Sequence, residues 1–310
     1  MSAEKATLVA ELSVHNELGE GIQWRAQDSS LWWTDILGCG LYRCGWPSRE
    51  IERFEMPEPL CSFAFIEGQD EILAAFASGL ATLNLRDGHV KWLQRLESGD
   101  DRVRLNDGRA DRQGRFWCGS MMKDMEACTD PEGELYCYAP EAGFSPRVCE
   151  QQIWISNGLC WSPDSRIMYF ADSPRQTIYR YDFESDSGIM SNRRVFATTP
   201  QGAYPDGANV DSQGRLWSAH WGASQVVCYD TNGQALWSVD TPASQPSCIA
   251  FGGENLSLLL VTSARQDLSR EQLQREPSAG NVFVYELPQQ WQVCGLPESV
   301  VNESEVSQVI

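Results

Sequence analysis

Four oxygen-bearing side chains recur at the same place in four stretches of the chain, a few residues before an acidic turn residue. They are Glu20, Asn106, Asn157 and Asp206. Two carboxylates and two carboxamides without a neighbouring lysine form a metal-seeking set, because the like charges are costly unless a cation joins them. All-oxygen ligation favours Ca²⁺, Mg²⁺ or Mn²⁺ and is also compatible with Zn²⁺ or Fe²⁺.

Each of these residues is also an ordinary turn former when it is taken alone, since Asn-Gly and Asp-Gly are common loop chemistry. The shared phase of the four is what argues for a site. If three of them bind one divalent ion, open coordination positions remain for water and substrate, as a catalytic site requires.

Repeats of the chain are the elements that would bring these side chains together. An acidic turn residue followed by an apolar or aromatic run marks each repeat; the markers are Asp28, Asp70, Asp111, Asp164, Asp211 and Glu254. Their spacing of roughly 40 to 50 residues is typical of propeller blades with about four short strands each. The sequence therefore predicts an all-β fold, a six-bladed β-propeller, with a metal site at one mouth of the central channel.

The repeats run almost end to end, so residues 1–310 are predicted to form a single domain. Residues 1–18 are expected to supply a closing strand, and 267–275 a short helix. Residues 122–133 form a polar insertion that is a candidate lid or substrate loop. The acidic tail from about residue 298 is expected to be partly flexible.

Charge and cysteine usage exclude several classes of partner. The formal net charge of -19 repels nucleic acid and anionic membranes. No apolar run is long enough for a membrane span or a signal peptide, and the eleven cysteines are scattered through strand-like runs as expected of reduced thiols. These features predict a cytoplasmic protein without a cysteine zinc site and leave the oligomeric state open.

Other catalytic chemistries have few candidate residues. The chain has three histidines, and His220 is interpreted as a strand or channel-wall residue rather than a base. Serine-hydrolase elbows, Walker loops, HExxH motifs and dinucleotide-binding glycine patterns are all missing from the sequence.

The chain resembles the regucalcin (senescence marker protein)/gluconolactonase/luciferin-regenerating enzyme family from about residue 15 to 290. The motifs that carry the resemblance are Gly19-Glu20-Gly21 with Trp24, Arg104-Leu105-Asn106-Asp107-Gly108, Gly119-Ser120-Met121, Ser156-Asn157-Gly158, Pro205-Asp206-Gly207 and Phe251-Gly252-Gly253. The resemblance implies a six-bladed propeller with one divalent metal ion in the channel.

The resemblance also implies roles for individual residues. The metal ligands fall on Glu20, Asn157 and Asp206, and Asp206 is also the implied general base. Substrate contacts fall on Arg104, Asn106 and Asp124, the last at a position where animal members have glutamate.

The implied activity is hydrolysis of a sugar lactone such as arabinono-, xylono-, galactono- or gluconolactone, with Ca²⁺, Zn²⁺, Mg²⁺, Mn²⁺ or Fe²⁺ as cofactor. Two alternatives stay open. One is hydrolysis of esters or organophosphates in the same site, and the other is a non-catalytic Ca²⁺-binding propeller.

Overall fold

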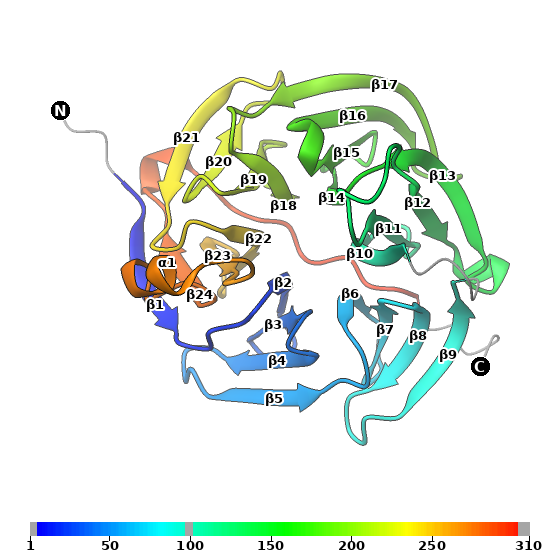
Figure 1. The fold of residues 1–310 in the computed structure, drawn as a ribbon, viewed down its shortest axis with the longest axis horizontal. Coiled ribbons are helices and arrows are strands. Elements are labelled where there is room, and N and C mark those ends of the chain that lie inside the picture. The colour runs from blue at the N-terminus through cyan, green and yellow to red at the C-terminus, as the bar shows by residue number, and fades with distance from the viewer. Residues whose placement is uncertain (1–4, 97–101, 303–310) are drawn as a thin grey trace.

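The computed structural model describes residues 5–96 and 102–302, and its regular structure is almost all β. Six four-stranded sheets surround a central axis as the blades of a propeller (Figure 1). In blades 1 to 5 the strands follow chain order from the innermost to the outermost. These blades are β2–β5 (Gly19–Arg25, Ser30–Asp35, Gly40–Gly45, Ile51–Glu55), β6–β9 (Leu60–Phe65, Glu71–Phe76, Gly79–Asn84, Val90–Arg95), β10–β13 (Val103–Ala110, Phe116–Met122, Gly133–Tyr138, Pro146–Ile153), β14–β17 (Ser156–Trp161, Ile167–Asp172, Thr177–Glu184, Ile189–Thr198) and β18–β21 (Tyr204–Val210, Leu216–Trp221, Gln225–Tyr229, Ala235–Asp240).

Blade 6 joins the two ends of the chain. Its three inner strands are β22 (Pro246–Gly252), β23 (Leu258–Ser263) and β24 (Val282–Glu286), and its outermost strand is β1 (Thr7–Leu12). Strand β1 pairs antiparallel with β24, so the first described strand closes the ring. The predictions of six blades and of a closing strand within residues 1–18 are confirmed.

Burial decreases from the axis outward. The innermost strands β6, β14 and β22 are buried along their whole length, whereas β5 and β17 are mostly exposed. Because neighbouring blades cover both faces of an inner strand, it shows no alternation of apolar and polar residues. A large hydrophobic cluster lies at each of the six junctions between adjacent blades, and the tryptophans Trp33, Trp117 and Trp217 are fully buried in these clusters.

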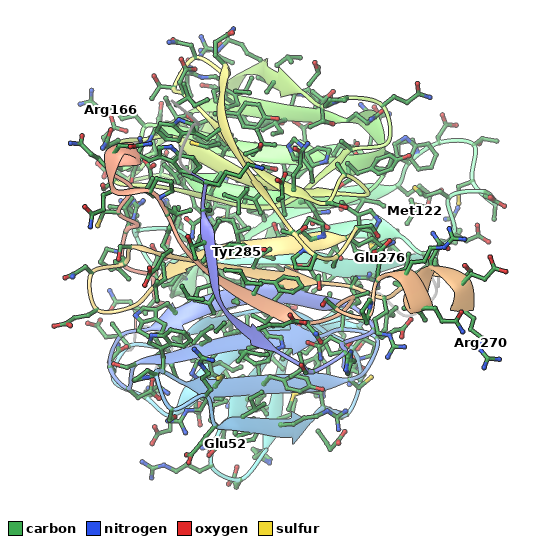
Figure 2. The ribbon with its side chains drawn as sticks, turned by 90° about the vertical axis from the view of Figure 1, so that its left-hand side faces the viewer. Glu52, Met122, Arg166, Arg270, Glu276 and Tyr285 are labelled. Carbon is green, nitrogen blue, oxygen red and sulfur yellow. The ribbon has the colours of Figure 1, made fainter. Side chains whose placement is uncertain are left out.

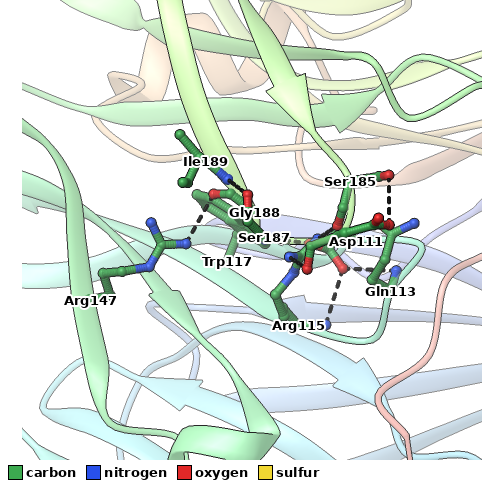
Figure 3. A network of polar contacts seen from close by, with 10 residues as sticks. Asp111, Gln113, Arg115, Trp117, Arg147, Ser185, Ser187, Gly188 and Ile189 are labelled. Atoms are coloured by element: carbon green, nitrogen blue, oxygen red, sulfur yellow. Dashed lines mark hydrogen bonds and ion pairs between the residues drawn. The ribbon is translucent and has the colours of Figure 1, made fainter.

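Two of the six acidic turn residues, Asp111 and Asp211, are completely buried, and the contacts of Asp111 connect adjacent blades (Figure 3). Asp111 accepts hydrogen bonds from Arg115 Nε at 2.6 Å and from Trp117 Nε1 at 2.9 Å, and its other oxygen accepts from the backbone N–H of Gln113 at 2.9 Å. The guanidinium of Arg115 then reaches the carbonyl of Ser185 in blade 4. Asp111 is completely buried, so the carboxylate depends on these partners.

The same arrangement recurs one hundred residues later. Asp211 accepts from Arg215 Nε at 2.6 Å and from Trp217 Nε1 at 3.1 Å, and Arg215 Nη1 donates to the carbonyl of Trp291 at 2.8 Å. The repeated Asp-x-x-Gly-Arg-x-Trp pattern therefore has a structural role, because in both copies the arginine connects the turn to the segment packed against it.

The remaining elements are short. The helix α1 (Arg270–Arg275) confirms the predicted helical turn, and the 3-10 helices are η1 (Pro140–Ala142), η2 (Ser173–Arg175) and η3 (Gln289–Trp291). All eleven cysteines are unpaired. Among the described residues no helix is long and apolar enough to cross a membrane. Of the predicted flexible tail, residues 298–302 contact the propeller, and 303–310 lie outside the described residues.

Candidate functional site

A cavity of about 500 Å³ occupies one mouth of the central channel, at the end where the innermost strands begin. All four phased residues line it, together with Arg104; the four are Glu20, Asn106, Asn157 and Asp206. Met122 lies in its wall, and Figure 2 shows this residue at the same end of the molecule as Glu276 and Arg270, with Arg166 at the other end. The sequence prediction that these side chains converge is confirmed by their common cavity.

Each innermost strand is irregular at the phased position. The pairing register shifts between Glu20 and Gln23 in β2, between Leu105 and Gly108 in β10, and between Asn157 and Cys160 in β14, with similar shifts in β6, β18 and β22. Such bulges re-aim side chains and are typical of the rims of closed sheets. They direct the phased side chains toward the axis.

Glycine is required at two of these bulges. Gly21 has φ 59° and Gly158 has φ 66°, a left-handed conformation that residues with a side chain rarely adopt. Gly21 and Gly158 thus allow the bulges that direct the preceding side chains, Glu20 and Asn157, toward the axis.

Two buried carboxyl groups meet at the cavity floor. Glu20 and Asp206 lie within hydrogen-bonding reach of each other. Burial raises the pKa of Glu20, and the nearby carboxylate of Asp107 raises it further. Burial and the charge of Glu20 raise the pKa of Asp206 well above its usual range. The charge of Glu20 therefore opposes ionisation of Asp206, and a bound cation would relieve this repulsion.

The amide of Asn157 is fixed so that its oxygen belongs to the same group. Its Nδ2 donates to Ser173 Oγ at 2.8 Å, and Ser173 Oγ in turn donates to the carbonyl of Pro205 at 2.7 Å. Its Oδ1 accepts from Asn106 Nδ2 at 3.3 Å, which leaves one lone pair of that oxygen for a ligand.

Asn106 and Arg104 support each other on the wall of the cavity. Arg104 Nη1 donates to Asn106 Oδ1 at 2.8 Å, and Asn106 Nδ2 donates to the carbonyl of Ser156 at 2.9 Å. Both amide hydrogens of Asn106 are thus directed at protein oxygens, one on Ser156 and one on Asn157. This side chain orients its neighbours before any ligand is bound.

Serine hydroxyls occupy the corresponding place in the two blades without a phased acid or amide. Ser62 Oγ donates to the carbonyl of Asn106 at 2.9 Å, and Ser247 Oγ donates to the carbonyl of Gly19 beside Glu20. Blades 2 and 6 therefore support the strands that carry the polar cavity residues.

Asp107 is a buried acid that the sequence did not single out. Its Oδ2 accepts the backbone N–H of Leu159 at 3.1 Å, so it anchors the bulge that presents Asn157. Its charge also raises the pKa of both Glu20 and Asp206. The available signal was its position, because Asp107 stands where the other three motifs have glycine after the phased residue.

The donor set fits a hard divalent cation. Within residues 5–96 and 102–302, no three Asp, Glu, His or Cys side chains are grouped to hold a metal ion by themselves. The candidate set instead combines two carboxylates, Glu20 and Asp206, with the amide oxygen of Asn157. Two mutually repelling carboxylates and an oriented amide oxygen are the ligand chemistry that Ca²⁺, Mg²⁺ or Mn²⁺ prefers.

The insertion after β11 borders the cavity, but Asp124 itself does not line it. Lys123 and Met125 contribute to the wall, whereas the exposed carboxylate of Asp124 accepts the backbone N–H of Glu126 at 3.0 Å and of Ala127 at 3.1 Å. The substrate contact predicted for Asp124 requires this carboxylate to leave its own turn, and it stays a prediction.

The sequence is similar to a protein family and to several curated relatives over most of its length. Residues 18–265 match the family model described as SMP-30/Gluconolactonase/LRE-like region. The chain is 39% identical to an L-arabinolactonase of Azospirillum brasilense, over 91% of this chain and 92% of the relative. It is 34% identical to a 6-deoxy-6-sulfogluconolactonase of Pseudomonas putida, over 86% and 90% of the two chains.

Solved structures agree with these sequence matches. A structure described as a calcium-binding protein, regucalcin, from Agrobacterium tumefaciens superimposes with a TM-score of 0.87 at 28% identity, over 94% of this chain and 97% of the other. A luciferin-regenerating enzyme superimposes with a TM-score of 0.85 at 25% identity, over 94% and 99%. With a family match across all six innermost strands, the chain belongs to the SMP-30/gluconolactonase/LRE-like family.

Proposed function

We propose that this protein is a metal-dependent lactonase that hydrolyses a sugar lactone to the aldonic acid. The observation that carries the proposal is the pair of carboxyl groups, Glu20 and Asp206, with the oriented amide of Asn157 at the floor of one cavity. The similarity to an L-arabinolactonase favours a pentonolactone, L-arabinonolactone, as substrate.

The residues of the cavity would have different roles in the reaction. A divalent ion held by Glu20, Asn157 and Asp206 would supply Lewis acidity toward the lactone carbonyl. Asp206 accepts the proton of the attacking water, as the general base. Arg104 donates hydrogen bonds to the substrate oxygens, because its guanidinium is held at the cavity wall by Asn106.

The wall of the cavity suits a small polyhydroxylated ring. Apolar and aromatic side chains, among them Ile155, Tyr204 and Trp221, face the polar floor. A mostly apolar wall with a few converging polar groups is typical of small-molecule sites. Asn106 and Asp124 are the further substrate contacts that we propose, the first from the wall and the second from the loop above it.

The test is acid release from a panel of lactones, followed by pH-stat. Metal-stripped protein receives Ca²⁺, Mg²⁺, Mn²⁺, Zn²⁺ or Fe²⁺ separately, with arabinono-, xylono-, galactono- and gluconolactone and an aryl ester as substrates. We expect one or two ions to restore turnover and L-arabinonolactone to be preferred. Acid release at the uncatalysed rate with every ion would refute the lactonase, and tight Ca²⁺ binding without turnover would establish a binding propeller instead.

A matched pair of variants locates the chemistry. Asp206→Asn should lower kcat/KM by about 100-fold or more, because it removes the base and one ligand. Asp267→Asn makes the same charge change at the exposed rim of the same cavity and should retain activity within a few-fold. Equal activity in the two variants would contradict the assignment, and a higher efficiency with the aryl ester than with every lactone would favour the esterase alternative.

A further inference from the structure

A C-terminal strap, residues 292–302, lies across the far mouth of the channel. Figure 1 shows it crossing the middle of the ring from blade 6 toward blade 2. Gly295 N donates to the carbonyl of Leu256 at 2.7 Å, and Val301 N donates to the carbonyl of Phe65 at 2.8 Å. The side chain of Val301 is completely buried, so the strap is packed against the propeller at both of its ends.

The strap and the candidate site lie at opposite ends of the innermost strands. Glu20, Asn106 and Asp206 are near the starts of β2, β10 and β18. The strap contacts the other ends: Phe65 is the last residue of β6, and Arg109 and Asn209 are each next to the last residue of their strands. The strap thus covers the channel beneath the site.

One strap residue meets a buried cation of the channel. Glu298 Oε2 lies 3.8 Å from Arg109 Nη1, and both side chains are only 9% exposed. Asn209 Nδ2 donates to the other oxygen of Glu298 at 3.4 Å. Arg109 Nη1 has no hydrogen-bond partner among the described residues, so the guanidinium is held by charge rather than by a hydrogen bond at that atom.

The same arginine is a near neighbour of a buried carboxylate on its own strand. Asp107 and Arg109 are two positions apart on β10 and both are buried, so little water screens their opposite charges from each other. Asp107 in turn accepts the N–H of Leu159, beside the Asn157 bulge, and its charge acts on Glu20 and Asp206. A continuous series of charges therefore runs from the candidate metal ligands through Asp107 and Arg109 to Glu298.

This series has a consequence for cation binding. With Glu298 present, Arg109 is shared between two carboxylates. Without it, the full positive charge of a buried guanidinium acts on Asp107 and on the acids above it, where little water screens it. The guanidinium would also be drawn toward Asp107, away from the strap, and would compete with Leu159 N–H for the carboxylate that anchors the Asn157 bulge.

We propose that Glu298 is a positioning residue of the metal site, acting through Arg109 and Asp107 to maintain the affinity for a divalent cation. This inference rests on the proposed metal site and goes beyond the proposed reaction, because it assigns the far mouth of the channel a part in metal binding. Glu298 itself touches neither metal nor substrate.

Metal titration of the full-length, metal-stripped protein tests the proposal without any lactone present. Calorimetric titration with CaCl₂ and with MnCl₂ should show a Kd that is about 3- to 10-fold higher for Glu298→Gln than for the unchanged protein. Glu298→Asp keeps the charge and should recover most of the affinity. At saturating metal, kcat of Glu298→Gln should stay within about twofold, because no reacting group is altered.

Two controls separate charge from loosening of the strap. Glu67→Gln makes the same charge change at an exposed position that is bonded to the strap through Glu67 N and the carbonyl of Val301. Val301→Ala loosens the strap without changing its charge. Both should bind metal as the unchanged protein does, although Val301→Ala should unfold at a lower temperature.

The outcomes are distinct. Equal metal affinity in Glu298→Gln and the unchanged protein would overturn the proposal, and so would an equal loss of affinity in Val301→Ala. Absence of binding in the unchanged protein would refute the metal site and this inference together. Normal binding with the expected loss in Glu298→Gln, but no lactone hydrolysis, would support the inference and refute the proposed reaction.

Discussion

Acid should destabilise the protein through His220, a histidine buried beside the candidate site. The residue lies on β19 at 1% exposure, with Nε2 3.1 Å from Tyr229 Oη and a buried Nδ1 that has no hydrogen-bond partner among the described residues. Burial lowers the pKa of His220 from 6.5 to about 4. The ring is therefore neutral near pH 7, in agreement with its interpretation as a strand residue.

The sign of the effect follows from proton uptake. Between about pH 6.5 and pH 4 the unfolded chain binds a proton that folded His220 does not, so the free energy of unfolding falls as the pH falls. At about 1.4 kcal/mol per pKa unit, the full effect is about 3 kcal/mol, and about 2 kcal/mol is already lost at pH 5. Above pH 6.5 this contribution is complete.

Urea unfolding of the metal-free protein at pH 7.5 and pH 5 measures the effect. His220→Gln does not titrate and keeps a group that can bond to Tyr229, so it should lose about 2 kcal/mol less than the unchanged protein over this interval. His89→Gln, at an exposed position, is the matched control. An equal loss in His220→Gln and the unchanged protein would refute the reasoning.

Three further substitutions test the contacts that form the candidate site and stabilise the propeller around it. Asp111→Asn breaks a buried ion pair and should lower the free energy of unfolding by about 3–5 kcal/mol, as a fall in melting temperature will show. Gly158→Ala should weaken metal binding, because φ is 66° there and the added methyl would lie 3.3 Å from the Asp206 carbonyl; Gly202→Ala, at φ 82° in open space, should cost about 1 kcal/mol of stability and leave metal affinity unchanged. Ser173→Ala removes the acceptor of Asn157 Nδ2 and should raise the metal Kd about 10-fold in calorimetric titration, and an unchanged Kd would contradict the orienting role of that hydroxyl.

The sequence predicted those parts of the site that repeat. Turn markers at similar intervals predicted six blades, and equal phase predicted that Glu20, Asn106, Asn157 and Asp206 would share a cavity. Equal phase is sufficient here because blades related by rotation place corresponding residues at the same height along the axis. The bulges that aim these side chains were not predicted, since only their glycines are visible in the sequence.

Features that occur only once in the chain could not be predicted from the repeats. Asp107 looks like one more turn residue in the sequence, and only the structure shows that it is buried and that it accepts the N–H of Leu159. Glu298 is far along the chain from Arg109 and lies in a segment whose acidic composition favoured a flexible tail. Contacts between a non-repeated segment and the axis carry no periodic signal.

The strap buries Arg109, and the buried guanidinium in turn requires the negative charge of Glu298. If the far mouth were open, water would screen Arg109, and no counter-charge would be needed there. Because the strap covers the channel, the guanidinium is buried and its charge must be balanced by protein groups, which are Asp107 and Glu298. Burial alone would lower the pKa of Arg109, yet Glu298 and Asp107 raise it above the ordinary arginine value, so the cation persists at every working pH.

Replacing Arg109 and Glu298 together should therefore weaken metal binding less than Glu298→Gln alone and destabilise the folded protein less than Arg109→Gln alone. In Arg109→Gln with Glu298→Gln, neither member of the Arg109–Glu298 pair is left buried without the other, and metal affinity should exceed that of Glu298→Gln alone. Arg109→Gln alone leaves Glu298 buried beside an amide and should be the least stable of the three in urea. A double-mutant cycle on metal affinity measures this coupling directly. Strictly additive effects would show that Arg109 and Glu298 act independently, and the charge series would then have no part in binding the cation.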